Sequence, residues 1–422
     1  MKVLVIGNGG REHALARALS ADPAVTALYC APGNPGIAEV AELRAVDALD
    51  PAAVRDLAVE LGVDLVVVGP EAPLVAGVAD PVRAAGIPVF GPSGAAALLE
   101  GSKAFSKEVM AAAGIPTAKS YVCQNEDEYA KALDEFAALG EGADGHSPYV
   151  VKDDALAAGK GVVVTEDRDA ALEHARACGR VVIEEYLDGP EVSLFGITDG
   201  RTVVPMMPSQ DFKRIGDGDT GPNTGGMGSY CPLPWAPEGL TEEVVATVIQ
   251  PLVDEMRRRG TPFAGLVYAG LALTAKGLRV VEFNARFGDP ETQSVLAMLE
   301  SPLSELLYGA ATGTLADVPA PRWRTGAAVT VVLAAAGYPG TPRGGDAISG
   351  IEAAEKLDTV VNQAGTKLDA AGALVTAGGR VLAVTAVGPD IAAARAKAYA
   401  GVEAVRFEGA RHRTDIAAKA TA

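Results

Sequence analysis

The chain has few cysteines, and they are scattered. Its 422 residues include four, Cys30, Cys123, Cys178 and Cys231, with no C-x-x-C pair and no Cys/His spacing suited to zinc. We therefore expect isolated thiols in a reducing cytoplasm rather than disulfides or a zinc site.

Long apolar runs are missing as well. The longest stretch, Ala327 to Ala336, has half the length of about 20 residues that a membrane helix needs. The chain opens with the apolar run Val3–Ile6 and then turns polar and charged, which predicts a strand and not a signal peptide. We expect no membrane partner and a cytoplasmic location.

The chain also has few basic residues compared with acidic ones. Lys and Arg number 36 against 54 Asp and Glu, which gives a formal net charge of -18, and no basic run interrupts this acidity. Such a chain repels a polyanion, so nucleic acid is excluded as an expected partner. Phosphate ligands would need a metal ion or a local cluster of Lys and Arg. Apolar residues make up 49% of the chain and charged residues 21%, values typical of a globular protein.

Residues 1–100 alternate short apolar runs with helical patterns. The runs are Val3–Ile6, Ala27–Cys30, Asp64–Val68 and Ile87–Phe90. This βα repeat predicts a parallel sheet. Each run ends in a loop rich in Gly or Pro, and in an open α/β sheet those ends face one crevice where ligands bind.

The rest of the chain predicts further α/β units. A helix is predicted from Ser102 to Ala113, then a small α+β lobe with a hairpin over Tyr149–Thr165. A long polar loop, Ser209–Tyr230, precedes a helix over Thr241–Arg259 and strands over Phe263–Thr274 and Leu278–Phe287. The predicted fold is a multidomain α/β protein. Its predicted domains are an N-terminal α/β substrate-binding domain (1–101), a central domain (102–120 and 189–325), a lid lobe (121–188) and a small C-terminal α+β domain (326–422).

The first glycine-rich loop has the sequence GNGGREH, from Gly7 to His13, between a strand and a helix. Backbone N–H groups at a helix start can hold a phosphate. The dinucleotide fingerprint needs Gly where Glu12 stands, which argues against a dehydrogenase. The alternatives left open are a monophosphate site and an ordinary βα turn.

Two later segments suit a nucleotide. Lys152 ends a strand before a loop of small residues, where it can supply a point charge to phosphates, although a surface hairpin would look similar. The extended segment Val181–Leu187 leads to Glu191, which could offer backbone groups to adenine and a carboxylate to ribose. An ordinary strand edge with solvated acids is the alternative.

A third segment, Val280–Glu291, suits a metal. Side chains at every second position of a strand share a face, so Glu282, Asn284 and Arg286 are predicted to point the same way. Carboxylate and amide oxygens are the ligands that Mg²⁺ prefers, and an adjacent arginine suits a phosphoryl group in transfer. A solvated strand face remains the alternative.

Together these segments resemble the nucleotide site of the ATP-grasp ligases. Within that superfamily the chain resembles the phosphoribosylamine–glycine ligases (glycinamide ribonucleotide synthetases), and the similarity runs from Met1 to about Thr385. The motifs that carry it are GNGGREHAL, APGN, VGPEAPLV, FGPS with EGSKAF, SQDFKR, DTGPNTGGMG and VEFNARFGDPETQ. The resemblance implies ligation of glycine to 5-phosphoribosylamine through glycyl phosphate, with ATP and Mg²⁺ (or Mn²⁺), by a monomer with an ATP-covering lobe.

The resemblance also implies roles for single residues. Those expected to line the nucleotide are Lys103, Lys152, Glu184, Glu185, Leu187 and Glu191; Glu282 and Asn284 would hold the metal, and Lys213 and Arg286 would steady the transferred phosphoryl group. Those expected to hold phosphoribosylamine are Gly9, Gly10, Arg11, Glu12, Gly33, Asn34 and Glu71, with Asp211, Asp289 and Glu291 near the amine chemistry.

Two departures from the family pattern bear on activity. The lid has Ala155 where glycine is usual, and if that position needs a positive φ, Ala155→Gly should raise turnover or lower the KM for ATP. The strand Phe263–Ala272 brings no carboxylate beside Glu282, which leaves one or two metal ions open. The rival functions are another ATP-grasp ligase and an inactive ATP-binding homologue.

Overall fold

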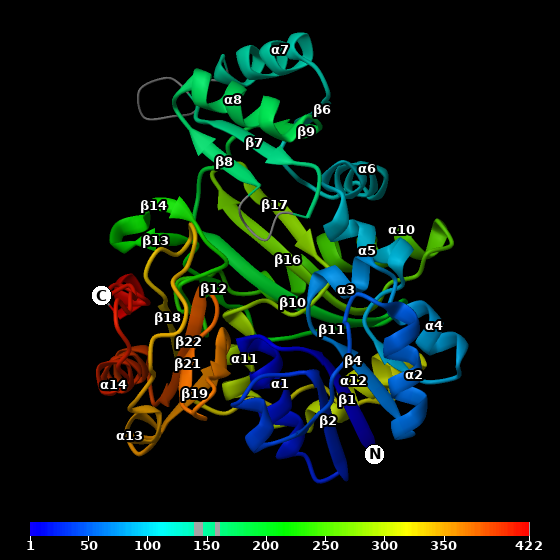
Figure 1. Ribbon diagram of the computed structural model, residues 1–422. Helices are drawn as coiled ribbons and strands as arrows, with labels where there is room; N and C mark the ends of the chain where they lie inside the picture. Colours follow the sequence, from blue (N-terminus) through cyan, green and yellow to red (C-terminus); the bar gives the residue numbers. More distant parts are fainter. Residues whose placement is uncertain (139–146, 157–160, 422) are drawn as a thin grey trace.

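The computed structural model describes residues 1–138, 147–156 and 161–421. Within these ranges the strands form four main sheets and two short ribbons, and helices cover the sheets (Figure 1). The predicted small-residue lid loop falls partly on residues 157–160, which lie outside the described ranges. Among the described residues, no helix combines the length and the apolar character needed to cross a membrane.

The N-terminal unit is a parallel sheet, as the βα repeat predicts. Its strand order is β3 (Glu42–Leu43), β2 (Ala27–Pro32), β1 (Lys2–Gly7), β4 (Leu65–Val68) and β5 (Val89–Phe90). Its helices are α1 (Gly10–Ser20), α2 (Pro51–Leu61), α3 (Glu71–Val75), α4 (Ala79–Ala84) and α5 (Gly94–Gly101), with a 3₁₀ turn at Ile37–Glu39. Both faces of this sheet are buried: Leu4 and Ile6 belong to one apolar cluster, Val3 and Val5 to another. This explains why its strands read as continuous apolar runs.

The central unit is an antiparallel sheet. Its order is β11 (Val203–Pro205), β10 (Glu191–Asp199), β16 (Ala264–Thr274) and β17 (Gly277–Asn284). The surrounding helices are α6 (Lys103–Ala113), α9 (Leu240–Val244), α10 (Gln250–Arg258) and α12 (Leu303–Thr312), with a 3₁₀ turn at Leu315–Asp317. The helix α11 (Glu291–Met298) follows β17 along the chain but packs against α1 and the C-terminal sheet. The helix predicted over Thr241–Arg259 is present as a helical run from Leu240 to Arg258, but it contains a π-helical segment that the prediction did not include. A π-helical segment, Val245–Ile249, separates α9 from α10 just before Pro251, which has no N–H to continue an α-helical ladder.

The lid lobe stands above this sheet at the top of Figure 1. Its strand order is β6 (Ser120–Cys123), β9 (Val181–Glu184), β7 (Tyr149–Asp153) and β8 (Val162–Thr165), covered by α7 (Glu126–Ala137) and α8 (Arg168–Cys178). The hairpin predicted over Tyr149–Thr165 is the antiparallel pair β7–β8.

The C-terminal sheet draws strands from two parts of the chain. Its order is β12 (Gln210–Asp211), β15 (Gly228–Cys231), β18 (Ala327–Ala334), β22 (Arg380–Gly388) and β19 (Thr359–Gln363), with helices α13 (Ile351–Glu355) and α14 (Ile391–Ala404). The ribbons are β13 (Arg214–Gly216) with β14 (Thr220–Asn223), and β20 (Thr366–Leu368) with β21 (Leu374–Thr376); 3₁₀ turns lie at Asp217–Asp219 and Ala418–Thr421. The long polar loop is thus built into the C-terminal sheet at both its ends, through β12 and β15.

Candidate active site

The nucleotide side of the site centres on a buried carboxylate between two lysines. Glu184, at the end of β9, pairs with Lys152 of β7 and, at 2.6 Å, with Lys107 of α6. Lys152 also donates to the Val281 carbonyl of β17 at 3.1 Å, which connects the lid lobe to the strand predicted to hold the metal. Burial alone would lower the pKa of Lys152, but Glu184 and Glu282 outweigh it and raise that pKa. The lysine is therefore charged and held in place before any phosphate arrives.

A second lysine–carboxylate group lies on the long loop. Lys213 pairs with Glu191 at the start of β10 and, at 3.1 Å, with Asp211. Burial raises the pKa of Asp211, whereas Asp211 and Glu191 together hold the pKa of Lys213 well above its usual value. Sequence analysis placed these three residues in the site, and the structure brings them into contact.

The predicted metal ligands share one side of β17. Glu282 lies opposite Gly270 and Asn284 opposite Tyr268 on β16, so both follow the same two-residue period. Among the described residues, no protein group donates a hydrogen bond to the side chain of Glu282 or Asn284, which leaves their oxygens available. No cluster of three or more His, Cys, Asp or Glu suited to a metal occurs in the described part of the chain. A metal here would depend on nucleotide phosphates and water for its other ligands.

Arg286 lies beyond the strand that was predicted to carry it. β17 ends at Asn284, although burial continues to alternate through Phe287. The Arg286 guanidinium pairs with Glu71 at 3.1 Å and Glu100 at 2.9 Å. It thereby joins the end of β17, the strand predicted to hold the metal, to the edge of the N-terminal sheet predicted to bind a ligand.

This arginine governs the two acids differently. Burial would raise the pKa of Glu71, but Arg286 and Arg11 outweigh it and lower that pKa to about 2. The carboxyl of Glu100 is more deeply buried, and burial raises its pKa in spite of Arg286. Glu100 also accepts a hydrogen bond from the Ala285 amide at 2.8 Å.

The first glycine loop closes on itself through Glu12. This buried side chain accepts hydrogen bonds from the Gly9 amide at 2.6 Å and from the Arg11 Nε at 2.5 Å. A Cβ at Gly69 would come within 2.1 Å of Glu12, so that glycine makes room for the acid. Glu12 therefore caps the N-terminus of α1. It occupies the position at which a dinucleotide-binding fold has a glycine for close packing.

Neighbouring loops complete this edge. Asn34 donates to the carbonyls of Asn8 and Gln363, both at 2.8 Å, and Gly33 adopts a φ of 72° beside it. Gly10 faces the Gln293 side chain across the crevice, where an added Cβ would meet it at 2.9 Å. The glycine loop, the APGN loop and the C-terminal domain thus meet at the predicted phosphoribosylamine site.

Asp289 lies against the same edge. It pairs with Arg380 of β22 at 3.3 Å and accepts from Gln293 at 2.8 Å. Burial would raise the pKa of Asp289, but Arg380 and Arg11 outweigh it and lower that pKa. Asp289 is therefore an ionised carboxylate held by the C-terminal domain.

Glu291 is a buried acid whose pKa is raised. It begins α11, is 3% exposed, and accepts a hydrogen bond from the Tyr268 hydroxyl at 2.5 Å. Burial, reinforced by Asp211, raises its pKa to about 7. Tyr268 also contacts the Ser193 hydroxyl at 2.8 Å.

The raised pKa of Glu291 predicts a pH-dependent stability. From the ordinary value of 4.5 up to about 7 the folded chain holds a proton that the unfolded chain releases, so this group's contribution to stability falls as pH rises through that window. The loss is on the order of 3 kcal/mol. Glu291→Gln cannot ionise at this position. The difference in melting temperature between this variant and the wild type should therefore shift in favour of the variant from pH 5 to pH 8. A difference that is the same at both pH values, or that matches the exposed control Glu300→Gln, would contradict this.

The other residues predicted to line the nucleotide lie where the lid lobe joins the central unit. Lys103, at the start of α6, donates to the Ala155 carbonyl at 3.3 Å. Glu185 is paired with Lys119 through backbone and side chain, each at 3.0 Å. Leu187 is half-buried in the segment that leads to β10.

The positive φ on which the Ala155 prediction depended is not observed. In the described part of the chain the non-glycine residues with positive φ are Asp219, Asp358 and Ala417, so the Ala155 backbone carries no such strain. Both its backbone hydrogen bonds, to Lys103 and Asp153, survive removal of Cβ. We now expect Ala155→Gly to leave kcat and the KM for ATP within about twofold of the wild type. A severalfold gain in steady-state ADP release would restore the original expectation.

Several site residues were missed from sequence. They are Lys107, Glu100, Tyr268, Ser193, Gln293 and Arg380. Glu100, Lys107 and Gln293 lie in or beside motifs that were recognised, so proximity to those motifs was an available signal. Tyr268, Ser193 and Arg380 sit in ordinary strands and had none.

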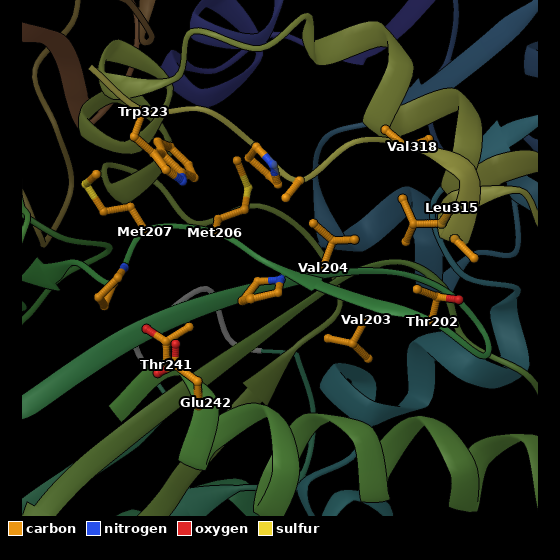
Figure 2. A pocket seen from close by; sticks show the side chains of 15 residues that line it. Thr202, Val203, Val204, Met206, Met207, Thr241, Glu242, Leu315, Val318 and Trp323 are labelled. Carbon is orange, nitrogen blue, oxygen red and sulfur yellow. The ribbon is translucent and has the colours of Figure 1, made fainter. Parts of the chain in front are cut away.

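An apolar groove of about 560 Å³ lies elsewhere. It runs between β11 and the segment after α12, and its lining includes Met206, Met207, Val318 and Trp323 (Figure 2). None of the predicted site residues lines it, so it has no part in the chemistry discussed here.

The fold and site together define a class. A hairpin lobe carrying a lysine–glutamate pair faces an antiparallel sheet whose edge strand presents a carboxylate and an amide. This arrangement is the one that the ATP-grasp resemblance predicts, and the matching ATP-grasp family model makes the chain a member of that class of ligases. The family models of phosphoribosylglycinamide synthetase match it in three parts: the N domain over residues 1–100, the ATP-grasp domain over 101–292 and the C domain over 328–419. The chain belongs to the phosphoribosylglycinamide synthetase family and forms a carbon–nitrogen bond in purine biosynthesis.

Relatives of known sequence or structure match the chain over nearly its whole length. The chain is 66% identical to the phosphoribosylamine–glycine ligase of Streptomyces coelicolor, covering 100% of this chain and 99% of that one, and 56% identical to that of Mycobacterium bovis, covering 100% and 98%. The crystal structure of the Thermotoga maritima ligase superposes with a TM-score of 0.83 at 30% identity, covering 99% of this chain and 100% of that one. A biotin carboxylase domain from Hydrogenobacter thermophilus, solved with MgADP, shares the fold at a TM-score of 0.71 and 18% identity, covering 97% and 91%.

Proposed function

We propose that glycine is joined to 5-phosphoribosylamine, at the expense of ATP, in the crevice between the lid, β17 and the ligand edge of the N-terminal sheet. The observation that carries this proposal is Arg286, which follows the metal-binding strand and pairs with Glu71 of the N-terminal sheet edge. One side chain thus connects the place for phosphoryl transfer with the place for the acceptor amine.

On the nucleotide side, we assign ATP to the surface between lid and central sheet. The residues assigned to it are Lys103, Lys152, Glu184, Glu185, Leu187 and Glu191. Glu282 and Asn284 are assigned to Mg²⁺ or Mn²⁺, which when bound would neutralise phosphate charge. Lys213 and Arg286 then face the transferred phosphoryl group with fixed positive charge.

On the acceptor side, we assign 5-phosphoribosylamine to the sheet edge. The residues assigned to it are Gly9, Gly10, Arg11, Glu12, Gly33, Asn34 and Glu71. Asp211, Asp289 and Glu291 are the carboxylates assigned to the amine. The pKa of Glu291 is raised to about 7, which suits it to accept a proton at physiological pH.

The reaction needs no covalent enzyme intermediate. The glycine carboxylate attacks the γ-phosphorus of ATP to give glycyl phosphate and ADP, and the amine then displaces phosphate through a tetrahedral intermediate. The protein contributes position, charge and exclusion of water, since glycyl phosphate hydrolyses readily. We retain the expectation of a cytoplasmic monomer that needs neither nucleic acid nor membrane.

The test is ADP release by the purified chain with ATP and Mg²⁺. Glycine alone should give little ADP, and glycine with freshly made 5-phosphoribosylamine should give sustained release together with glycinamide ribonucleotide. ATP binding without turnover in the presence of both substrates would support an inactive homologue. ADP release with a different acid and amine pair would support another ligase of the same class.

A further inference from the structure

A buried arginine in the C-terminal tail has no place in the chemistry described so far. Arg413 follows α14, within the stretch that the C-domain family model matches, and is only 1% exposed. It forms a two-point ion pair with Asp415, with both N–O distances at 2.7 Å. Burying a guanidinium costs several kcal/mol unless its donors are satisfied, so its remaining contacts are informative.

Those contacts lie on the long loop that follows β12. The Arg413 Nη1 donates to the Arg214 carbonyl at 3.2 Å and to the Asp219 carboxylate at 2.8 Å. The guanidinium also lies over the Phe212 ring, 4.9 Å from its centroid. One side chain therefore holds both ends of the segment from Phe212 to Asp219.

Phe212 lies between the two functional residues of this loop. Along extended backbone successive side chains alternate, so Asp211 and Lys213 project away from the face on which Phe212 meets Arg413. Asp211 and Lys213 form an ion pair at 3.1 Å. The Phe212 ring packs near the Tyr230 ring, with a distance of 6.2 Å between the ring centroids. The Phe212 ring is thus fixed from behind by the tail.

Phe212 and Lys213 are also held by the backbone of the loop itself: the Phe212 amide donates to the Gly228 carbonyl at 3.0 Å, and the Lys213 carbonyl accepts from the Thr224 amide at 2.7 Å. The outer part of the loop, by contrast, lies at the surface. No residue of the ribbon β13–β14 is buried, and the 3₁₀ turn between its strands is exposed. The tail supplies additional anchors there, from the Thr414 amide to Asp217 and from the Gly218 amide to Asp415, each at 2.8 Å. In Figure 1 the C-terminus accordingly lies beside this ribbon.

We infer that Arg413 is a positioning residue for catalysis, which sets Asp211 and Lys213 through its contacts with Phe212, Arg214 and Asp219. The inference rests on the proposed roles of Asp211 and Lys213. It assigns the C-terminal tail a direct part in the active-site geometry rather than in closing the fold alone.

The test compares Arg413→Met with Arg395→Met. Arg395 donates to the tail carbonyls of Thr414 and Ile416 but contacts no residue of the loop, so it controls for tail anchoring. With saturating substrates, Arg413→Met should lower kcat about tenfold or more, with the calorimetric Kd for ADP within about threefold of the wild type; Arg395→Met should change kcat less than about twofold. Arg413→Lys, which keeps the charge without the fork, should recover part of the loss.

A double-mutant cycle with Lys213→Met separates the outcomes. If Arg413 acts through the loop, the double variant should be no slower than Lys213→Met alone. Losses that multiply, or a loss in Arg413→Met no greater than in Arg395→Met, would overturn the inference and leave the proposed function standing. An unimpaired Lys213→Met would overturn both. If Arg413→Met does not fold, Phe212→Leu, which keeps the buried ion pairs, should still lower kcat severalfold, and an unchanged kcat would overturn the inference.

Discussion

Replacing Glu282 with glutamine should lower ADP release by at least about a hundredfold at ordinary Mg²⁺ concentrations. The change replaces the one charged ligand assigned to the metal with a neutral amide, and charge stabilisation of phosphoryl transfer by a metal is worth several kcal/mol. Because Glu282 is not hydrogen-bonded to other described residues, the fold should not depend on it. The measurement is steady-state turnover over a Mg²⁺ titration, with melting temperature recorded for each variant.

The matched control for this experiment is Glu300→Gln, which removes an exposed carboxylate just after α11. It should keep wild-type turnover at every Mg²⁺ concentration. The Glu282→Gln variant should instead need more Mg²⁺ for half-maximal activity. Equal Mg²⁺ dependence in both variants would remove Glu282 from the metal site.

Replacing Arg286 with methionine should damage both stability and turnover. The substitution strands the carboxylates of Glu71 and Glu100, whose side chains are 24% and 8% exposed, and breaking a buried ion pair costs about 3–5 kcal/mol. It also removes a charge assigned to the transferred phosphoryl group, so kcat should fall about a hundredfold or more. Thermal unfolding and ADP release would measure the two losses separately.

The dependence of stability on acidic pH should also reveal the contact between Arg286 and Glu71. The pKa of Glu71 is lowered to about 2 by Arg286 and Arg11, so the stability that this group contributes is present above its ordinary value of 4.5 and is lost as pH falls toward 2. Arg286→Met should have lost part of that contribution already, and its melting temperature should fall less steeply with acid over this window.

The control for Arg286 is Arg343→Met. Arg343 pairs with Asp346 at 2.9 Å and Glu408 at 3.3 Å, but its side chain is 45% exposed. Exposed ion pairs contribute about 0–1 kcal/mol, so this variant should unfold near the wild-type temperature. A comparable loss in the two variants would mean that Arg286 is no more than another surface arginine.

Much of the fold was predictable because local patterns decided it. The βα repeat of the first 100 residues predicted the parallel sheet, and the hairpin over Tyr149–Thr165 formed as expected. The interrupted helix before Pro251 shows where periodicity alone falls short, since apolar spacing does not register a missing N–H. The domain boundaries at 101, 120, 188 and 325 stay predictions.

The site was predictable where function depends on a short segment. Glu282 and Asn284 share a face because a strand has a period of two, and Lys213 meets Asp211 because it lies two positions further along the chain. The partners of these residues were not predictable in the same way. Glu100 meets Arg286 across 186 positions of the sequence, a contact that no local rule contains.

The amino-acid sequence by itself therefore determined the elements, the motif residues and the class of chemistry, because each depends on neighbours within a few positions. The tertiary structure alone decided which charges meet: Glu184 between Lys107 and Lys152, Glu291 under Tyr268, and Arg413 behind Phe212. The physical reason is that burial and charge pairing act through space. Their strength is set by how the domains pack and not by the order of residues along the chain.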